Sequence, residues 1–257
     1  HPVQLDKVHE ALVISGLRCL GGYNEFASIW KKDSNTDEKT FKKFGIAAVD
    51  YTDADTARGF TYTTLQNEFP PTPILSPINP FNEDIIAAKN VLEIGCGVGR
   101  NLPYIMEKTN AHYWGIDPNK EMLQYFWDVS DHKYKDRVTL VHDWSELPVD
   151  LKFDFVLSTF VFQHIAFMVP EGVMNVSDIT KEAMKFTEAG TVWFVLEHER
   201  EQAGWQERWM KECGIVPEVY YRPGGNHAGG GTIPYPEFVS MVHRGNDNNI
   251  IIFKEKK

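Results

Sequence analysis

The stretch Val91-Leu92-Glu93-Ile94-Gly95-Cys96-Gly97-Val98-Gly99-Arg100 decides the fold that this sequence predicts. An apolar run is broken by an acidic residue and three alternating glycines, after which Leu102, Ile105 and Met106 repeat at helical spacing. The pattern predicts a strand, a tight turn and a helix. Glycine suits such a turn because it reaches positive φ and lets a ligand approach the backbone closely. A turn that binds nothing is the alternative, but each glycine would then cost stability without a ligand.

A second short strand follows at 112–116, and Asp117 stands at its end. A carboxylate in this place can accept hydrogen bonds from the hydroxyls of a ribose. A dinucleotide fold expects the spacing G-x-G-x-x-G. Here the spacing is Glu-x-Gly-x-Gly-x-Gly, and Arg100 stands where the last glycine of the dinucleotide pattern would be. The stretch resembles the first motif of the class I S-adenosylmethionine-dependent methyltransferases, and Asp117 resembles their second.

Alternation of strands and helices continues after Asp117. Strands are predicted at 138–142, 153–158, 191–196 and 250–253, with helical apolar spacing between the earlier ones. The nearly continuous apolarity of 153–158 predicts a strand that is buried on both faces. The pattern, with the resemblance, predicts an α/β fold: a doubly wound, mostly parallel seven-stranded sheet with an antiparallel last strand. Either 216–221 or 238–243 supplies the remaining strand, and the pattern does not choose between them.

In open parallel sheets, ligands lie beyond the carboxyl ends of the strands. The family's cofactor is S-adenosylmethionine, and the resemblance gives each residue after a strand a part in holding it. Arg100 either pairs with the methionine carboxylate or is a solvated arginine at a helix start. Asp143 either reads the adenine amine or caps a short helix. The implied contacts are Glu93, Gly95, Gly97 and Gly99 for the methionine portion, Asp117 for the ribose, Pro118, Met122, Asp143 and Trp144 for the adenine, and Ser158 and Phe160 beside the methionine moiety.

Methyl transfer is an in-line displacement at a carbon that the sulfonium already activates, so the protein mainly aligns and desolvates the reactants. A base is needed only where the nucleophile must lose a proton. His164 is the first candidate because it follows the fourth strand and titrates near neutrality. Its alternative role is a structural hydrogen bond to backbone at the strand end. Glu197 and His198, after the fifth strand, form a second candidate pair.

Composition narrows the class of partner. The formal net charge of −10 argues against a nucleic-acid substrate, because that affinity comes mostly from Lys and Arg. Cys19, Cys96 and Cys213 stand far apart and form no C-x-x-C pair, which argues against a structural zinc site and suits a reducing compartment. No metal site is expected. The sequence has no run of about 18 apolar residues and no secretory pattern at its start, so we expect a cytoplasmic protein without a membrane span.

The chain is expected to divide into an N-terminal helical cap with a proline-rich connector, 1–82, and a methyltransferase domain, 83–257, with a loop insertion near 222–236. Helical faces are predicted in 1–50, one of them carrying Phe26, Ile29 and Trp30. These helices either pack against the sheet or form a lid over the substrate. The resemblance covers 88–200 well and the rest poorly.

The sequence therefore predicts an enzyme that methylates an oxygen or a nitrogen of a small molecule. The oligomeric state is left open. Two alternatives stay open: a protein or peptide methyltransferase, because an acidic surface with aromatic residues suits a basic tail, and a non-catalytic homologue that keeps the cofactor pocket.

Overall fold

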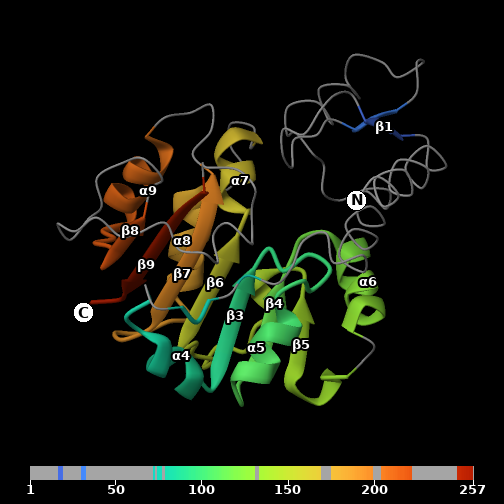
Figure 1. Cartoon of the computed structure of the whole chain (residues 1–257), viewed down its shortest axis with the longest axis horizontal. Coiled ribbons are helices and arrows are strands. Elements are labelled where there is room, and N and C mark those ends of the chain that lie inside the picture. Colours follow the sequence, from blue (N-terminus) through green and yellow to red (C-terminus); the bar gives the residue numbers. More distant parts are fainter. Residues whose placement is uncertain are drawn as a thin grey trace.

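A computed structural model of the 257-residue chain describes residues 17–19, 30–32, 72, 74–76, 79–130, 133–168, 175–198, 204–221 and 248–256. Most of these residues form one twisted sheet with helices on both faces (Figure 1). Its strands are β3 (Asn90–Ile94), β4 (His112–Ile116), β5 (Val138–Val141), β6 (Phe155–Thr159), β7 (Val192–His198), β8 (Val219–Tyr221) and β9 (Asn248–Lys254).

The strands lie in the order β5-β4-β3-β6-β7-β9-β8. Each neighbouring pair from β5 to β7 is parallel, whereas β9 runs antiparallel to both β7 and β8. The predicted seven-stranded sheet with an antiparallel last strand is therefore confirmed. The segment 216–221 supplies β8, and 238–243 lies outside the described residues. From β3 the chain continues to β4 on one side, and from β6 it continues to β7 on the other. The carboxyl ends of the adjacent strands β3 and β6 are therefore the switch point of the sheet.

Helices cover both faces. On one face lie α4 (Asn82–Ala87), α5 (Leu102–Lys108) and α6 (Lys120–Ser130), and on the other lie α7 (Phe162–Met168), α8 (Val176–Met184) and α9 (Trp205–Cys213). Two single-turn 3₁₀ helices, η1 (Lys135–Arg137) and η2 (Trp144–Glu146), flank β5. In the part of the chain that the structure describes, no helix is long and apolar enough to cross a membrane.

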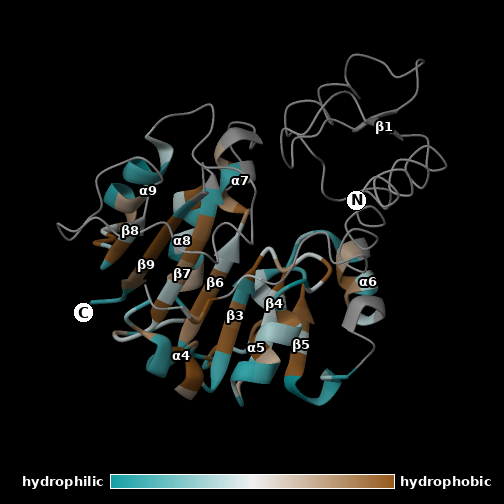
Figure 2. Cartoon of the chain, viewed as in Figure 1, coloured by the Kyte–Doolittle hydropathy of each residue, from teal (hydrophilic) through white to brown (hydrophobic). Residues whose placement is uncertain are grey.

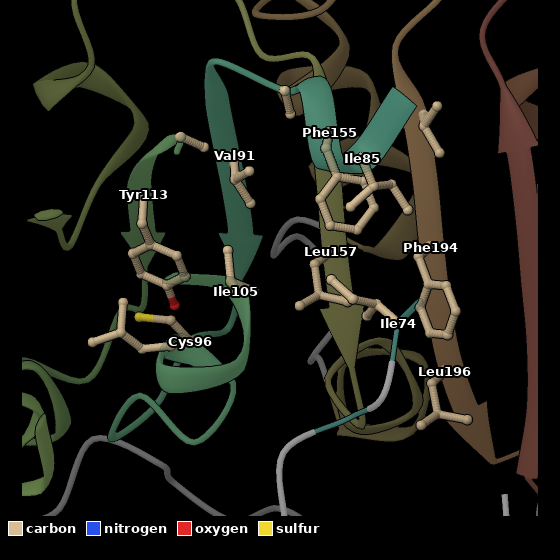
Figure 3. Packing of buried hydrophobic residues seen from close by; sticks show 14 of the residues in the cluster. Ile74, Ile85, Val91, Cys96, Ile105, Tyr113, Phe155, Leu157, Phe194 and Leu196 are labelled. Carbon is tan, nitrogen blue, oxygen red and sulfur yellow. The ribbon is translucent and has the colours of Figure 1, made fainter. Parts of the chain in front are cut away.

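Side chains alternate along the strands and so build two cores, one on each face of the sheet. The first core lies under α4, α5 and α6, and the second lies under α7, α8 and α9. Figure 2 shows the central strands as apolar. Val91 packs toward α5 and Leu92 toward the α7–α9 face. Every residue of β6 is buried, as predicted for this part of 153–158, whereas Asp154 precedes the strand and is exposed. The connector contributes to the first core, since Ile74 is 1% exposed and lies between Leu157 and Phe194 (Figure 3). The domain boundary near residue 82 stays a prediction.

Within residues 1–50 the structure describes only a pair of antiparallel strands, β1 (Leu17–Cys19) and β2 (Trp30–Lys32). Trp30, which the apolar spacing assigned to a helix face with Phe26 and Ile29, is a strand residue, so that prediction is wrong at this position. A three-residue strand is too short to show the alternation that separates strands from helices. The other predicted helix faces of the cap, and the insertion 222–236, lie outside the described residues.

Candidate functional site

The turn after β3 carries three glycines in the left-handed region, and their surroundings differ. A Cβ on Gly95 would lie 2.3 Å from a methyl carbon of Val161, and one on Gly99 would lie 2.5 Å from the ring of Phe126. At Gly97 the nearest atom is the sulfur of Met122 at 3.4 Å, and φ is +53°. The outer glycines are therefore required by packing. The central glycine leaves open space above the backbone, which is what close approach of a ligand needs.

Asp117 lies directly beside this opening. Its Oδ2 accepts a hydrogen bond of 2.9 Å from the backbone N–H of Gly97, and its Oδ1 accepts one of 2.8 Å from the N–H of Asn119. Burial raises the pKa of Asp117 to about 6, and these two hydrogen bonds act in the opposite direction. Each carboxylate oxygen accepts two hydrogen bonds, so Asp117 keeps acceptor capacity for a ligand hydroxyl.

Glu93 is 2% exposed and points into the first core rather than across the turn. Its Oε1 accepts a hydrogen bond of 2.6 Å from Asn101 Nδ2, and its Oε2 accepts one of 2.5 Å from the hydroxyl of Tyr113. Burial raises the pKa of Glu93 to about 7, while the two donors and the nearby Arg100 lower it. Both oxygens are thus engaged by protein groups, and Glu93 fixes the strand end from which the glycine turn begins.

Arg100 is held by protein contacts and does not extend freely into water. Its Nη2 donates to the hydroxyl of Thr159 at 3.0 Å and contacts that of Thr72 at 3.4 Å. Its Cζ lies 5.5 Å from the ring centroid of Phe160. Burial lowers the pKa of Arg100 to about 10, and the charge of Glu93 opposes that shift. The guanidinium therefore stays cationic at neutral pH at the carboxyl end of β6.

The segment after β6 is fixed from β7. Phe160 has a φ of 60°, and its N–H donates to the carbonyl of Leu196 at 2.8 Å. The buried carboxylate of Glu197 accepts the backbone N–H groups of Val161, Phe162 and Gln163 at 3.0, 2.9 and 3.1 Å.

The hydroxyl of Ser158 also donates a hydrogen bond to Oε1 of Glu197, at 3.4 Å. Burial raises the pKa of Glu197 to about 7, and the hydrogen bonds from 161–163 lower it. Glu197 therefore caps the start of α7. Because Val161 in turn packs against Gly95, this cap also supports the glycine turn.

The two histidine candidates lie at the same edge of the sheet as the glycine turn. His164 is in the first turn of α7, and His198 is the last residue of β7. Their side chains lie outside what the structure describes. The catalytic assignments of His164, Glu197 and His198 stay predictions.

The residues predicted to contact the adenine, after β4 and β5, differ in how far they are exposed to solvent. Met122 is buried beneath Gly97, whereas Pro118 is exposed. Asp143 caps η2, since its Oδ1 accepts the N–H of Ser145 at 2.8 Å. Hydrogen bonding from the side chain and then the backbone of Ser145 holds the pKa of the Asp143 carboxyl below the usual value. The capping role that the sequence left open is therefore present, and Asp143 remains exposed. Trp144 is half-buried, stacked on Phe186 with ring centroids 6.3 Å apart.

Sequence reasoning missed Asn101, Thr159 and Tyr113, which join Glu93 and Arg100 into one hydrogen-bonded cluster. Tyr113 and Asn101 are polar residues among apolar, core-facing neighbours, and this pattern could have indicated a buried hydrogen-bonded cluster. Among the described residues, no group of three or more His, Cys, Asp or Glu side chains could hold a metal ion.

The chain is similar to known methyltransferases in sequence and in fold. A family model described as a methyltransferase domain matches residues 92–183, which include the glycine turn, Asp117, Asp143 and β6. The chain is 28% identical over 124 residues to phosphoethanolamine N-methyltransferase 1 of Arabidopsis thaliana, a match that covers 44% of this chain. The chain spans about a quarter (24%) of the length of that plant protein.

Among solved structures, the chain is similar to a candidate S-adenosyl-L-methionine-dependent methyltransferase of Methanococcus maripaludis. The TM-score is 0.52 at 15% identity, and the match covers 80% of this chain and 94% of the other. At this identity the likeness shows a shared fold.

Proposed function

We propose that this chain, which belongs to the class I S-adenosylmethionine-dependent methyltransferases, transfers a methyl group to an oxygen or a nitrogen of a small-molecule acceptor. The cofactor of this family is S-adenosylmethionine. It supplies a methyl carbon that its sulfonium activates for in-line displacement. We also propose that the protein is cytoplasmic and that the residues assigned below hold the cofactor and the acceptor.

One observation carries the cofactor site: the open face of Gly97 lies beside the Asp117 carboxylate, and a hydrogen bond joins the two. A ligand that crosses the backbone at Gly97 would lie beside the carboxylate, where the nearest atom to a Cβ on Gly97 is the sulfur of Met122 at 3.4 Å. We assign the ribose hydroxyls to Asp117, because a carboxylate with free lone pairs is a suitable acceptor for a diol. The methionine portion then extends along Gly95, Gly97 and Gly99 toward the carboxyl end of β6.

Arg100 and Phe160 stand at that end, so the guanidinium is our candidate partner for the methionine carboxylate. The backbone from Ser158 to Phe160 borders the same portion. We assign the adenine to the side of Met122, Pro118 and Trp144, with Asp143 as the acceptor for its amine. Glu93 supports the turn from inside, because its carboxyl is 2% exposed and is held by Asn101 and Tyr113.

For an acceptor that must lose a proton, we propose His164 as the base, with His198 as the next candidate. For Glu197 we propose a positioning role instead. Its carboxylate is buried and accepts hydrogen bonds from three backbone N–H groups, so it holds the 161–163 segment in place. An amine acceptor can release its proton to water after transfer, in which case neither histidine is needed as a base.

The small-molecule class is supported by the similarity to a plant phosphoethanolamine N-methyltransferase, whose length this chain matches only in part. The test begins with calorimetry, in which S-adenosylhomocysteine should bind saturably and NAD should compete poorly. Transfer of a labelled methyl group is then assayed with phosphoethanolamine, other small amines and alcohols, and basic peptides. Transfer to peptides alone would favour a protein methyltransferase. Binding without transfer to any acceptor would favour a non-catalytic homologue, and no binding would overturn the proposal.

A further inference from the structure

Asn101 stands at the N-cap position of α5, yet its side chain makes no hydrogen bond to the first turn of that helix. Asparagine is common at this position because its oxygen usually accepts a helix N–H. Here the carboxamide is 1% exposed and contacts other segments. Its Nδ2 donates to Glu93 Oε1 at 2.6 Å and to Thr159 Oγ1 at 3.0 Å, and its Oδ1 accepts the N–H of Thr72 at 2.8 Å.

One buried amide therefore joins three segments that are distant in sequence: the end of β3, the end of β6 and the connector. Only a carboxamide supplies donors to a carboxylate and a hydroxyl together with an acceptor for a backbone N–H. A carboxylate would lack the donors, and an apolar side chain would leave buried polar groups unpaired. These demands explain why asparagine stands at 101 although it caps nothing.

Residues next to Asn101 hold the same part of the connector. Thr72 is fully buried, and its hydroxyl lies 3.4 Å from Arg100 Nη2. The hydroxyl of Tyr104 donates to the carbonyl of Leu75 at 3.4 Å. The start of α5 thus holds the connector segment 72–76 against the strand end from which the glycine turn begins.

We propose that Asn101 is a positioning residue that couples the glycine turn to the connector segment 72–76. Through it, binding of the cofactor stabilises the packed position of the connector, and release of the connector weakens cofactor binding. This inference rests on the proposed cofactor site. The coupling is reciprocal, because two events that share one free-energy term must affect each other equally.

Three variants test the coupling by calorimetry with S-adenosylhomocysteine. Asn101→Ala removes the carboxamide. Thr72→Pro removes the connector N–H that the carboxamide accepts, together with the threonine hydroxyl. Thr72→Val keeps that N–H and is the matched control. We expect the first two variants to bind about two- to tenfold more weakly, the range of one net hydrogen bond. Because both Thr72 variants lack the hydroxyl, Thr72→Pro should also bind more weakly than Thr72→Val. The double variant with Asn101→Ala and Thr72→Pro should bind no more weakly than Asn101→Ala alone.

Hydrogen exchange supplies a measurement that a purely structural role would not change. In the wild-type protein, saturating S-adenosylhomocysteine should slow exchange in peptides that cover 72–76. This ligand-dependent protection should disappear in Asn101→Ala and persist in Asn110→Ala, an exposed asparagine just after α5. Normal affinity together with persistent protection in Asn101→Ala would overturn the coupling alone. Absence of binding by the wild-type protein would overturn the proposed function and this inference with it. If Asn101→Ala does not fold, Thr72→Pro decides by the same two measurements, because it leaves Glu93 and Thr159 paired with Asn101.

Discussion

The backbone N–H of Gly97 donates a hydrogen bond of 2.9 Å to Oδ2 of Asp117, which joins the turn after β3 to the end of β4. The two sequence motifs are therefore parts of one structural unit. In the proposed cofactor site, a ligand on the turn would lie beside the carboxylate.

Gly97→Val should weaken binding of S-adenosylhomocysteine by more than about tenfold, because a branched side chain would fill the open space above the turn. The fold should survive, since no atom lies within 3.4 Å of the new Cβ and the left-handed backbone costs only about 1–2 kcal/mol. Calorimetry and thermal unfolding measure the two effects. Gly190→Val is the matched control: its φ is +101°, nothing lies within 4 Å, and it precedes β7 at the opposite edge of the sheet. It should lose stability and keep its affinity, and equal affinities in both variants would remove Gly97 from the site.

Asp117→Ala should weaken S-adenosylhomocysteine binding by about ten- to a hundredfold, because the ribose hydroxyls would lose their acceptor. Asp154→Ala is a suitable comparison. Asp154 also accepts two backbone N–H groups, those of Lys89 and Asn90, but it lies at the amino end of β6. Its loss should lower the melting temperature and leave affinity unchanged. A parallel loss of affinity in both variants would mean that Asp117 acts only through stability.

The ligand-free protein should lose stability as pH rises from about 4.5 to about 7. In this window the Glu93 carboxyl, whose pKa is about 7 when folded and 4.5 ordinarily, keeps its proton in the folded state and loses it in the unfolded chain. Burial of Asp117 and Glu197 acts with the same sign, since it raises the pKa of each above its ordinary value. Glu93→Gln should flatten the dependence of melting temperature on pH, and an unchanged slope would contradict this account of Glu93.

Glu197→Ala should speed hydrogen exchange at Val161, Phe162 and Gln163, because their N–H groups would lose a buried acceptor. Affinity for S-adenosylhomocysteine should fall with it, since Val161 packs on Gly95. Glu197→Gln keeps the shape and one acceptor oxygen, so it should show an intermediate effect. Normal exchange in the alanine variant would contradict the positioning role of Glu197.

His164→Ala should slow transfer to a hydroxyl acceptor by about a hundred- to ten-thousandfold, the usual contribution of a general base. With an amine acceptor the loss should be far smaller. Initial rates at saturating cofactor measure both, and His198→Ala serves as the comparison because it is the next candidate at the same edge. A full rate on a hydroxyl acceptor would end the catalytic role of His164.

The sequence was sufficient where one local pattern carries the structure. The glycine turn, the placement of Asp117 and the alternation of strands and helices follow from spacing that local sterics enforce. Asn101 was not predictable in its role, because its partners Glu93, Thr159 and Thr72 come together only when β3, β6 and the connector are packed. The helix prediction for Trp30 was wrong for a related reason. β2 has three residues and is fixed by pairing with β1, and so short a strand shows no periodicity in the sequence.

The place of β9 between β7 and β8 has a consequence for synthesis on the ribosome. β8 is translated first but pairs only with β9, so within the described sheet it has no neighbour until β9 emerges. Until then β7 presents an unpaired edge with the apolar residues Val192–Leu196. Such an edge invites pairing with other chains. The nascent protein should therefore need a chaperone, or rapid completion of translation, to avoid aggregation during this interval.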